Sequence, residues 1–155
     1  MSTEIIPPAS SVYERVGYLI KQLQHALRGQ MDEELRAIQL STAQYALLNA
    51  IDAQSGSSGA DLARRCFITP QSVNGLISGL EQSKLISRTA SVEHGRIIKI
   101  ALSPSGRSRL KAAHRIVGDI EKRMLVGIDL EQHKKLAELL RQCIDGLRKP
   151  QKSIR

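Results

Sequence analysis

Gln71, Asn74 and Ser78 follow one another at steps of three and four residues, which places their polar side chains on one side of a helix. Gln and Asn amides can each form two hydrogen bonds to adenine, and a Ser hydroxyl can bond to either type of base. The opposite side of this helix is apolar and carries Val73, Leu76, Ile77 and Leu80. The pattern predicts a helix that buries one face and can read base edges with the other. In isolation such a polar face is more often an ordinary solvated surface, so its meaning depends on the elements around it.

The polar face contains no Lys or Arg, so contacts to phosphate groups must come from the residues around it. The predicted phosphate contacts are Arg64, Arg65, Lys84, Arg88, Arg96 and Lys99. The predicted DNA contacts on the polar helix itself are Pro70, Gln71, Ser72, Asn74, Gly75 and Ser78. Gly75 and Gly79 each destabilise a helix interior by about 1 kcal/mol relative to Ala, which close approach to DNA or to the preceding helix would explain.

Short elements position these residues. Capping sequences predict two helices, over 41–53 and 59–66. Ser41 is followed three residues later by Gln44 at the start of the first, and Ser58 by Asp61 at the start of the second. Thr69-Pro70 then starts the polar helix, which runs to about residue 83.

The pattern changes to strands after the polar helix. Residues 85–89 are typical of a strand, residues 98–102 alternate apolar and other side chains, and His94-Gly95 marks the turn. Residues 41–103 therefore predict a winged helix-turn-helix DNA-binding subdomain, whose second helix can enter the major groove of DNA.

Long amphipathic helices flank this subdomain. They are predicted over 11–37 and within 104–149, where one helix reaches about residue 126 and the next ends before Pro150. Residues 150–155 form a basic tail. The predicted fold is mainly α with a two-stranded β wing, in a single domain spanning 1–155.

Composition narrows the class of protein. The chain has 155 residues, 41% of them hydrophobic, and lacks both an apolar run of membrane-spanning length and a signal peptide, so we expect a cytoplasmic protein with no membrane partner. Cys66 and Cys143 are far apart, which favours reduced thiols, and the four His residues show no metal-ligand spacing. No nucleophile elbow, phosphate-binding loop or paired carboxylates appear, so neither catalytic residues nor a cofactor are predicted.

The net charge of +8 favours a polyanionic partner, because Lys and Arg release counterions when they neutralise phosphates. Residues 60–103 carry six basic and three acidic groups, whereas residues 104–155 carry thirteen and six. Much of the excess positive charge therefore lies outside the predicted DNA-binding subdomain, and part of it is expected to be solubilising helix surface.

The sequence resembles the MarR family of winged helix-turn-helix transcriptional regulators over nearly its whole length. The segments that carry the resemblance are 41–44, 59–65, 69–73, 80–81, 85–88 and 102–106, which include Gly-Ala-Asp-Leu-Ala-Arg-Arg and Thr-Pro-Gln-Ser-Val. The resemblance implies a homodimer that binds a palindromic operator, with the N- and C-terminal helices as dimerisation helices. It offers Val12, Val16, Leu19, Leu136, Leu140 and Leu147 as interface residues; an intrachain core is the alternative for each.

The same resemblance implies a repressor released by a small anionic or phenolic effector that binds between the winged unit and the dimerisation helices. Arg15, His25 and Tyr45 are candidates for this crevice, and oxidation of Cys66 or Cys143 is an alternative signal. Arg96 corresponds to the wing-tip arginine that enters the minor groove.

Two departures from the family pattern concern the wing and the end of the polar helix. The family's wing usually has an Asp two residues before the arginine, where this chain has His94. Lys84 stands where a glycine usually ends the helix, so a non-glycine residue is predicted in a left-handed conformation, at about 1 kcal/mol.

Two other functions remain open. A constitutive architectural DNA-binding protein would use the basic C-terminal helices on any duplex. An interaction module that has lost DNA binding would explain the uncharged polar helix and the altered wing.

Overall fold

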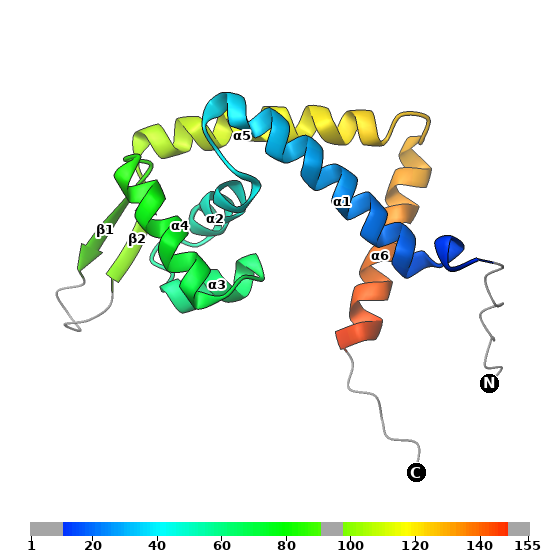
Figure 1. Ribbon diagram of the computed structural model, residues 1–155, viewed down its shortest axis with the longest axis horizontal. Coiled ribbons are helices and arrows are strands. Elements are labelled where there is room, and N and C mark those ends of the chain that lie inside the picture. Colours follow the sequence, from blue (N-terminus) through cyan, green and yellow to red (C-terminus); the bar gives the residue numbers. More distant parts are fainter. Residues whose placement is uncertain (1–10, 91–97, 149–155) are drawn as a thin grey trace, which may run out of the picture. The chain divides into compact units, whose positions relative to one another are not determined.

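The computed structural model describes residues 11–90 and 98–148, apart from the side chains at the two ends of the gap. The described chain is helical with one two-stranded antiparallel sheet, as predicted (Figure 1). Its elements are η1 (Val12–Glu14), α1 (Val16–Leu35), η2 (Arg36–Ile38), α2 (Thr42–Ala53), α3 (Gly59–Cys66), α4 (Pro70–Gln82), β1 (Ile86–Ala90), β2 (Ile98–Leu102), α5 (Pro104–Met124) and α6 (Leu130–Arg148). It divides into two compact units, Met1–Ile120 and Glu121–Arg155, and each is described by itself. The predicted turn at His94-Gly95 and the basic tail lie outside the described residues.

The N-terminal helix is shorter than the predicted range of 11–37. Arg15 has an extended backbone, with φ −69° and ψ 133°, which separates the 3-10 turn η1 from α1. At the other end, η2 closes with Gln39 in the left-handed region at φ 55°. Amphipathic spacing continues through both breaks, which explains why periodicity alone joined these segments.

Side-chain caps begin the helices where the sequence predicts them. Ser41 with Gln44 and Ser58 with Asp61 form complete capping boxes at the starts of α2 and α3. Thr69 accepts a hydrogen bond from the Ser72 backbone N–H, with Pro70 at the first position of α4. These caps satisfy N–H groups that have no partner within the helix.

The hairpin starts one residue later than predicted, at Ile86. The Leu85 N–H donates to the Leu80 carbonyl at 2.9 Å, so Leu85 closes the turn that follows α4 and is not yet part of the strand. Ile86 pairs with Leu102 and Arg88 with Ile100 in the antiparallel register.

One hydrophobic core holds α2, α3 and α4 against the hairpin and the first part of α5. Its most deeply buried side chains are Leu35, Leu47, Leu48, Ile51, Leu62, Val73 and Leu80. This core fixes the orientation of α4 on the remainder of the first unit.

In the second unit α6 has no buried residue among those described. It begins with a cap in which the Gln132 N–H donates to Asp129 Oδ1 at 2.8 Å. Leu136 and Leu140 are half-buried, and Leu147 is 89% exposed. No helix of the described ranges has both the length and the apolar character that a bilayer span requires.

Candidate nucleic-acid interface

The helix α4 presents a polar stripe above a fully packed apolar face. Gln71, Asn74, Gly75 and Ser78 are exposed. Val73, Ile77 and Leu80 on the opposite side are 0–3% exposed. Packing therefore determines which side of α4 faces outward, and that side carries the hydrogen-bonding groups that the sequence predicts for base contacts.

The N-terminal end of α4 uses part of its polar surface internally. Ser72 Oγ lies 2.8 Å from Thr69 Oγ1, which also accepts the Ser72 backbone N–H at 3.1 Å. Ser72 and Pro70 are exposed. Of the predicted contacts on α4, Ser72 thus has a structural partner already.

Two exposed arginines on α3 are held by neighbouring side chains. Arg64 forms an ion pair with Asp61, and Arg65 donates to the Gln54 side-chain oxygen. A hydrogen bond from Ser58, more than the arginine, holds the pKa of Asp61 below its usual value, so this carboxylate stays charged beside Arg64.

Arg88 has an internal role that sequence patterns did not indicate. Its Nε lies 2.9 Å from Glu81 Oε2, and its Nη2 lies 3.5 Å from Ser78 Oγ. Because Glu81 and Ser78 lie on α4 while Arg88 lies on β1, this arginine ties the wing strand to the polar helix. An Arg seven residues after a Glu, at the junction of helix and strand, is the only sequence signal for this pair.

Lys84 adopts the left-handed conformation predicted for it, with φ 57°. Its backbone carbonyl accepts hydrogen bonds from Ser103 Oγ at 2.7 Å and Ser105 Oγ at 2.8 Å. The side chains of Lys84 and Lys99 are exposed. Arg96 lies outside the described residues.

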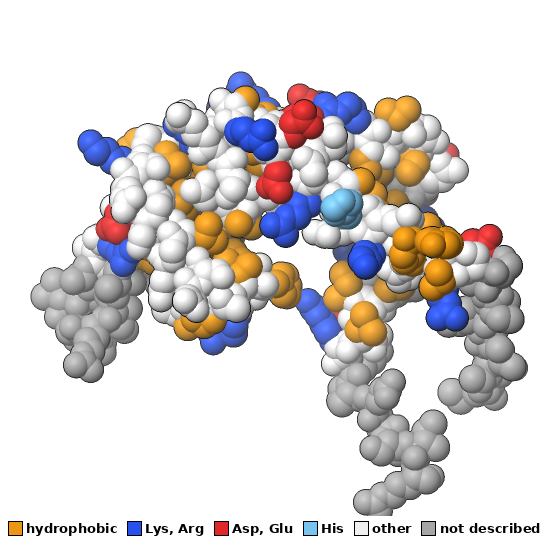
Figure 2. Space-filling model, viewed as in Figure 1, with side chains coloured by type: hydrophobic (Ala, Val, Ile, Leu, Met, Phe, Trp, Pro, Cys, Tyr) orange, Lys and Arg blue, Asp and Glu red, His pale blue; other side chains and the backbone are white. Residues whose placement is uncertain are grey.

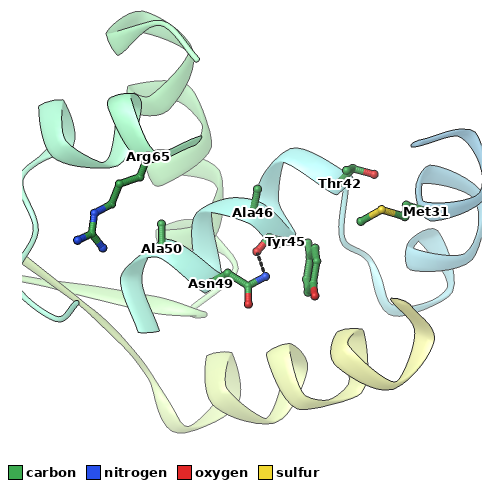
Figure 3. Close-up of a pocket in the computed structure, with 7 residues that line it drawn as sticks. All are labelled: Met31, Thr42, Tyr45, Ala46, Asn49, Ala50 and Arg65. Carbon is green, nitrogen blue, oxygen red and sulfur yellow. Dashed lines mark hydrogen bonds between the residues drawn. The ribbon is translucent and has the colours of Figure 1, made fainter. Parts of the chain in front are cut away.

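A pocket of about 540 Å³ opens between α1, α2 and α3 in the first unit (Figure 3). It is lined by Met31, Thr42, Tyr45, Ala46, Asn49, Ala50 and Arg65. Of the residues predicted for the effector crevice, Tyr45 lines this pocket, whereas the exposed Arg15 and His25 do not.

Tyr45 also links the pocket to α5. Its hydroxyl lies 3.1 Å from His114 Nδ1, and the two rings meet edge to face with centroids 5.6 Å apart. Asn49 donates to the Tyr45 carbonyl at 3.0 Å, which fixes the amide within the pocket (Figure 3).

The two cysteines differ in environment. Cys66 is half-buried, and burial raises the pKa of its thiol despite the opposing charge of Arg65. Cys143 is exposed, although its spacing from Leu136, Leu139, Leu140 and Leu147 places it among the apolar positions of α6. Amphipathic spacing identifies the apolar face of a helix. It does not show that other residues of the same chain bury that face.

Comparisons with known proteins agree with this geometry. The model of the MarR family matches residues 38–97. The HTH-type transcriptional repressor Rv2887 of Mycobacterium tuberculosis is 29% identical over 125 residues, which cover 81% of this chain and 90% of that protein.

Solved structures share the fold. Rv2887 in complex with salicylic acid superposes with a TM-score of 0.70 at 28% identity, covering 83% of this chain and 96% of the other. The S. aureus MepR–DNA complex gives a TM-score of 0.76 at 24% identity, covering 88% and 99%; at this identity the likeness concerns the fold alone.

The packed helices α2, α3 and α4 and the two-stranded sheet have the winged helix-turn-helix arrangement that the sequence predicts. The chain is similar to transcriptional regulators of the MarR family. The curated relatives that it matches are HTH-type transcriptional repressors.

Proposed function

We propose that this protein is a homodimeric repressor that binds a palindromic operator and is released by a small effector. The exposed stripe of Gln71, Asn74, Gly75 and Ser78 carries this proposal, because the opposite side of α4 packs into the core and this side faces outward. The Ser78 hydroxyl also lies 3.5 Å from Arg88 Nη2, so Arg88 is positioned beside the stripe. Arg64, Arg65, Lys84 and Lys99 are exposed on neighbouring elements, where they can contact phosphates.

Dimerisation is supported by apolar side chains that the described chain leaves uncovered. On η1 and α1, Val12 is 55%, Val16 63% and Leu19 50% exposed. Figure 2 shows hydrophobic side chains gathered on the surface over the start of α1. On α6, Leu139 is 45% and Leu147 89% exposed. Large exposed apolar faces mark interaction sites, and a second copy of the same chain would cover both helices.

The pocket at Tyr45 supports a small aromatic acid as effector. Its walls are largely apolar, with Met31 and Ala46, while Asn49 and Arg65 supply a hydrogen-bonding amide and a positive charge. Rv2887, a relative of this chain, was crystallised with salicylic acid and with p-aminosalicylic acid. Arg65 is also a predicted phosphate contact, so a carboxylate at this arginine would compete with DNA.

DNA binding is tested by titrating the purified chain with the duplex upstream of its own gene and with a scrambled duplex at one salt concentration. A preference of about a thousandfold supports a sequence-specific regulator. Equal affinity for the upstream duplex, the scrambled duplex and a duplex selected from a random library would instead favour an architectural DNA-binding protein. Failure to bind any of these duplexes would favour an interaction module.

The effector site is tested with salicylate as the probe. Ala46→Leu places a larger side chain in the pocket, where it would occupy space that salicylate needs. We expect the affinity for salicylate to fall by about tenfold or more, which is a loss of about 1.4 kcal/mol of binding free energy. Ala43→Leu, on the same helix but outside the pocket lining, is the matched control. Equal salicylate affinity in both variants would place the effector elsewhere.

A further inference from the structure

Gly75 lies in the middle of the exposed stripe of α4. It is one turn after Gln71 and about one turn before Ser78, on the side of the helix that faces outward. A Cβ atom built on Gly75 would meet no atom of the chain within 4 Å. A side chain at this position would therefore have open space within the protein.

The chain's own structure gives no reason for glycine at this position. Glycine in a helix interior lowers stability relative to alanine, because it loses more backbone freedom on folding. Gly75 has no left-handed backbone that would require glycine. Gly106 differs, since a Cβ there would lie 1.9 Å from the Leu85 carbonyl oxygen.

Ser78 adds a geometric requirement. Its hydroxyl is attached directly to Cβ, so it can reach a base edge only where the backbone of α4 comes close to the DNA. A side chain on Gly75, one turn earlier on the same outward side, would hold that part of the helix away.

We propose that Gly75 sets the distance at which α4 approaches the base edges of DNA. The inference rests on the proposed DNA-reading function of α4. It follows that a single methyl group at position 75 should stabilise the folded protein and weaken sequence-specific binding. Binding through phosphates alone should change little, because the cations around α4 tolerate a looser approach.

Gly75→Ala is the test, with Gly29→Ala as its matched control. Gly29 is exposed in the interior of α1, and a Cβ there would also meet nothing within 4 Å. In urea unfolding, both substitutions should raise the ratio of folded to unfolded protein by about fivefold.

Binding is then measured with a duplex that the wild-type chain selects from a random-sequence library, beside a scrambled duplex. Gly75→Ala should lose about tenfold or more in affinity for the selected duplex and change by less than about twofold on the scrambled one. Gly29→Ala should bind both duplexes as the wild type does.

Undiminished binding of Gly75→Ala to the selected duplex would overturn the inference and leave the proposed function intact. A lower stability of Gly75→Ala would also overturn it, because it would reveal a contact within the chain. Failure of the wild type to select any duplex would overturn the proposed function, and the inference with it.

Discussion

Gly106 lies where the first turn of α5 crosses the backbone of Leu85. A Cβ on Gly106 would lie 1.9 Å from the Leu85 carbonyl oxygen, which is far too close. Because the clashing atom belongs to the backbone, a side-chain rotation cannot relieve the clash. We expect Gly106→Ala to lower the free energy of unfolding by about 3 kcal/mol, the upper range for overpacking. Gly118→Ala is the control, because Gly118 lies in the same helix and a Cβ there would meet no atom within 4 Å. Equal unfolding midpoints in urea for the two variants would contradict this packing.

Cys66 is the last residue of α3, and the reactivity of its thiol reports how far it is buried there. Because burial raises the pKa of its thiol, the reactive thiolate forms at higher pH in the folded protein than in the unfolded chain. We expect alkylation of Cys66 by iodoacetamide at pH 7 to be slower in the folded protein than in urea, and its rate in the folded protein to rise with pH. Mass spectrometry of the modified peptide measures the rate. Equal rates in folded and unfolded protein at pH 7 would contradict the burial and revive a redox role for this cysteine.

Lys84 follows the end of α4 in a backbone conformation that favours glycine. Its φ of 57° should make Lys84→Gly more stable by about 1 kcal/mol, since glycine lacks the Cβ that crowds the backbone there. If Lys84 also contacts a phosphate, the slope of log affinity against log salt should fall by about one. Thermal unfolding and a salt titration separate the two effects. A less stable variant would show that the lysine side chain contributes packing that offsets its backbone strain.

Local sequence rules predicted most element boundaries, because caps act within three or four residues. Ser58 with Asp61 fixes the start of α3, and Thr69-Pro70 fixes that of α4. The partnership of Arg88 with Glu81 was missed, since it depends on how a strand returns against a helix. The left-handed backbone of Phe67, with φ 55°, was not predicted, because bulky residues rarely adopt this conformation and the sequence around Phe67 does not indicate it.

The pocket was predicted only in part for the same reason. Tyr45 lines it, but Asn49 and Arg65 meet there because the core packs α2 against α3. Arg65 was predicted as a phosphate contact alone, and its place in the pocket wall could not be read from periodicity.

The exposed apolar faces of the flanking helices carry the proposal of a dimer. Leu19 is 50% exposed on α1, so Leu19→Glu should leave the fold of one subunit intact while placing a charge in the proposed dimer interface. We expect the dissociation constant of the dimer to rise by about tenfold or more, as measured by sedimentation equilibrium. Gln22→Glu, an exposed polar position on the same helix, is the control. Unchanged dimerisation of Leu19→Glu would place the interface on other residues.

Removal of the polar stripe of α4 tests whether this helix reads DNA sequence. The variant combines Gln71→Ala, Asn74→Ala and Ser78→Ala, which removes hydrogen-bonding groups from an exposed surface and leaves the buried face unchanged. Its affinities for the selected and scrambled duplexes are measured across a range of salt concentrations. We predict that the preference for the selected duplex falls by about a hundredfold while the salt slope stays that of the wild type, because bases and phosphates are contacted by different residues. Retention of the wild-type preference would contradict the account and assign sequence recognition to another part of the chain.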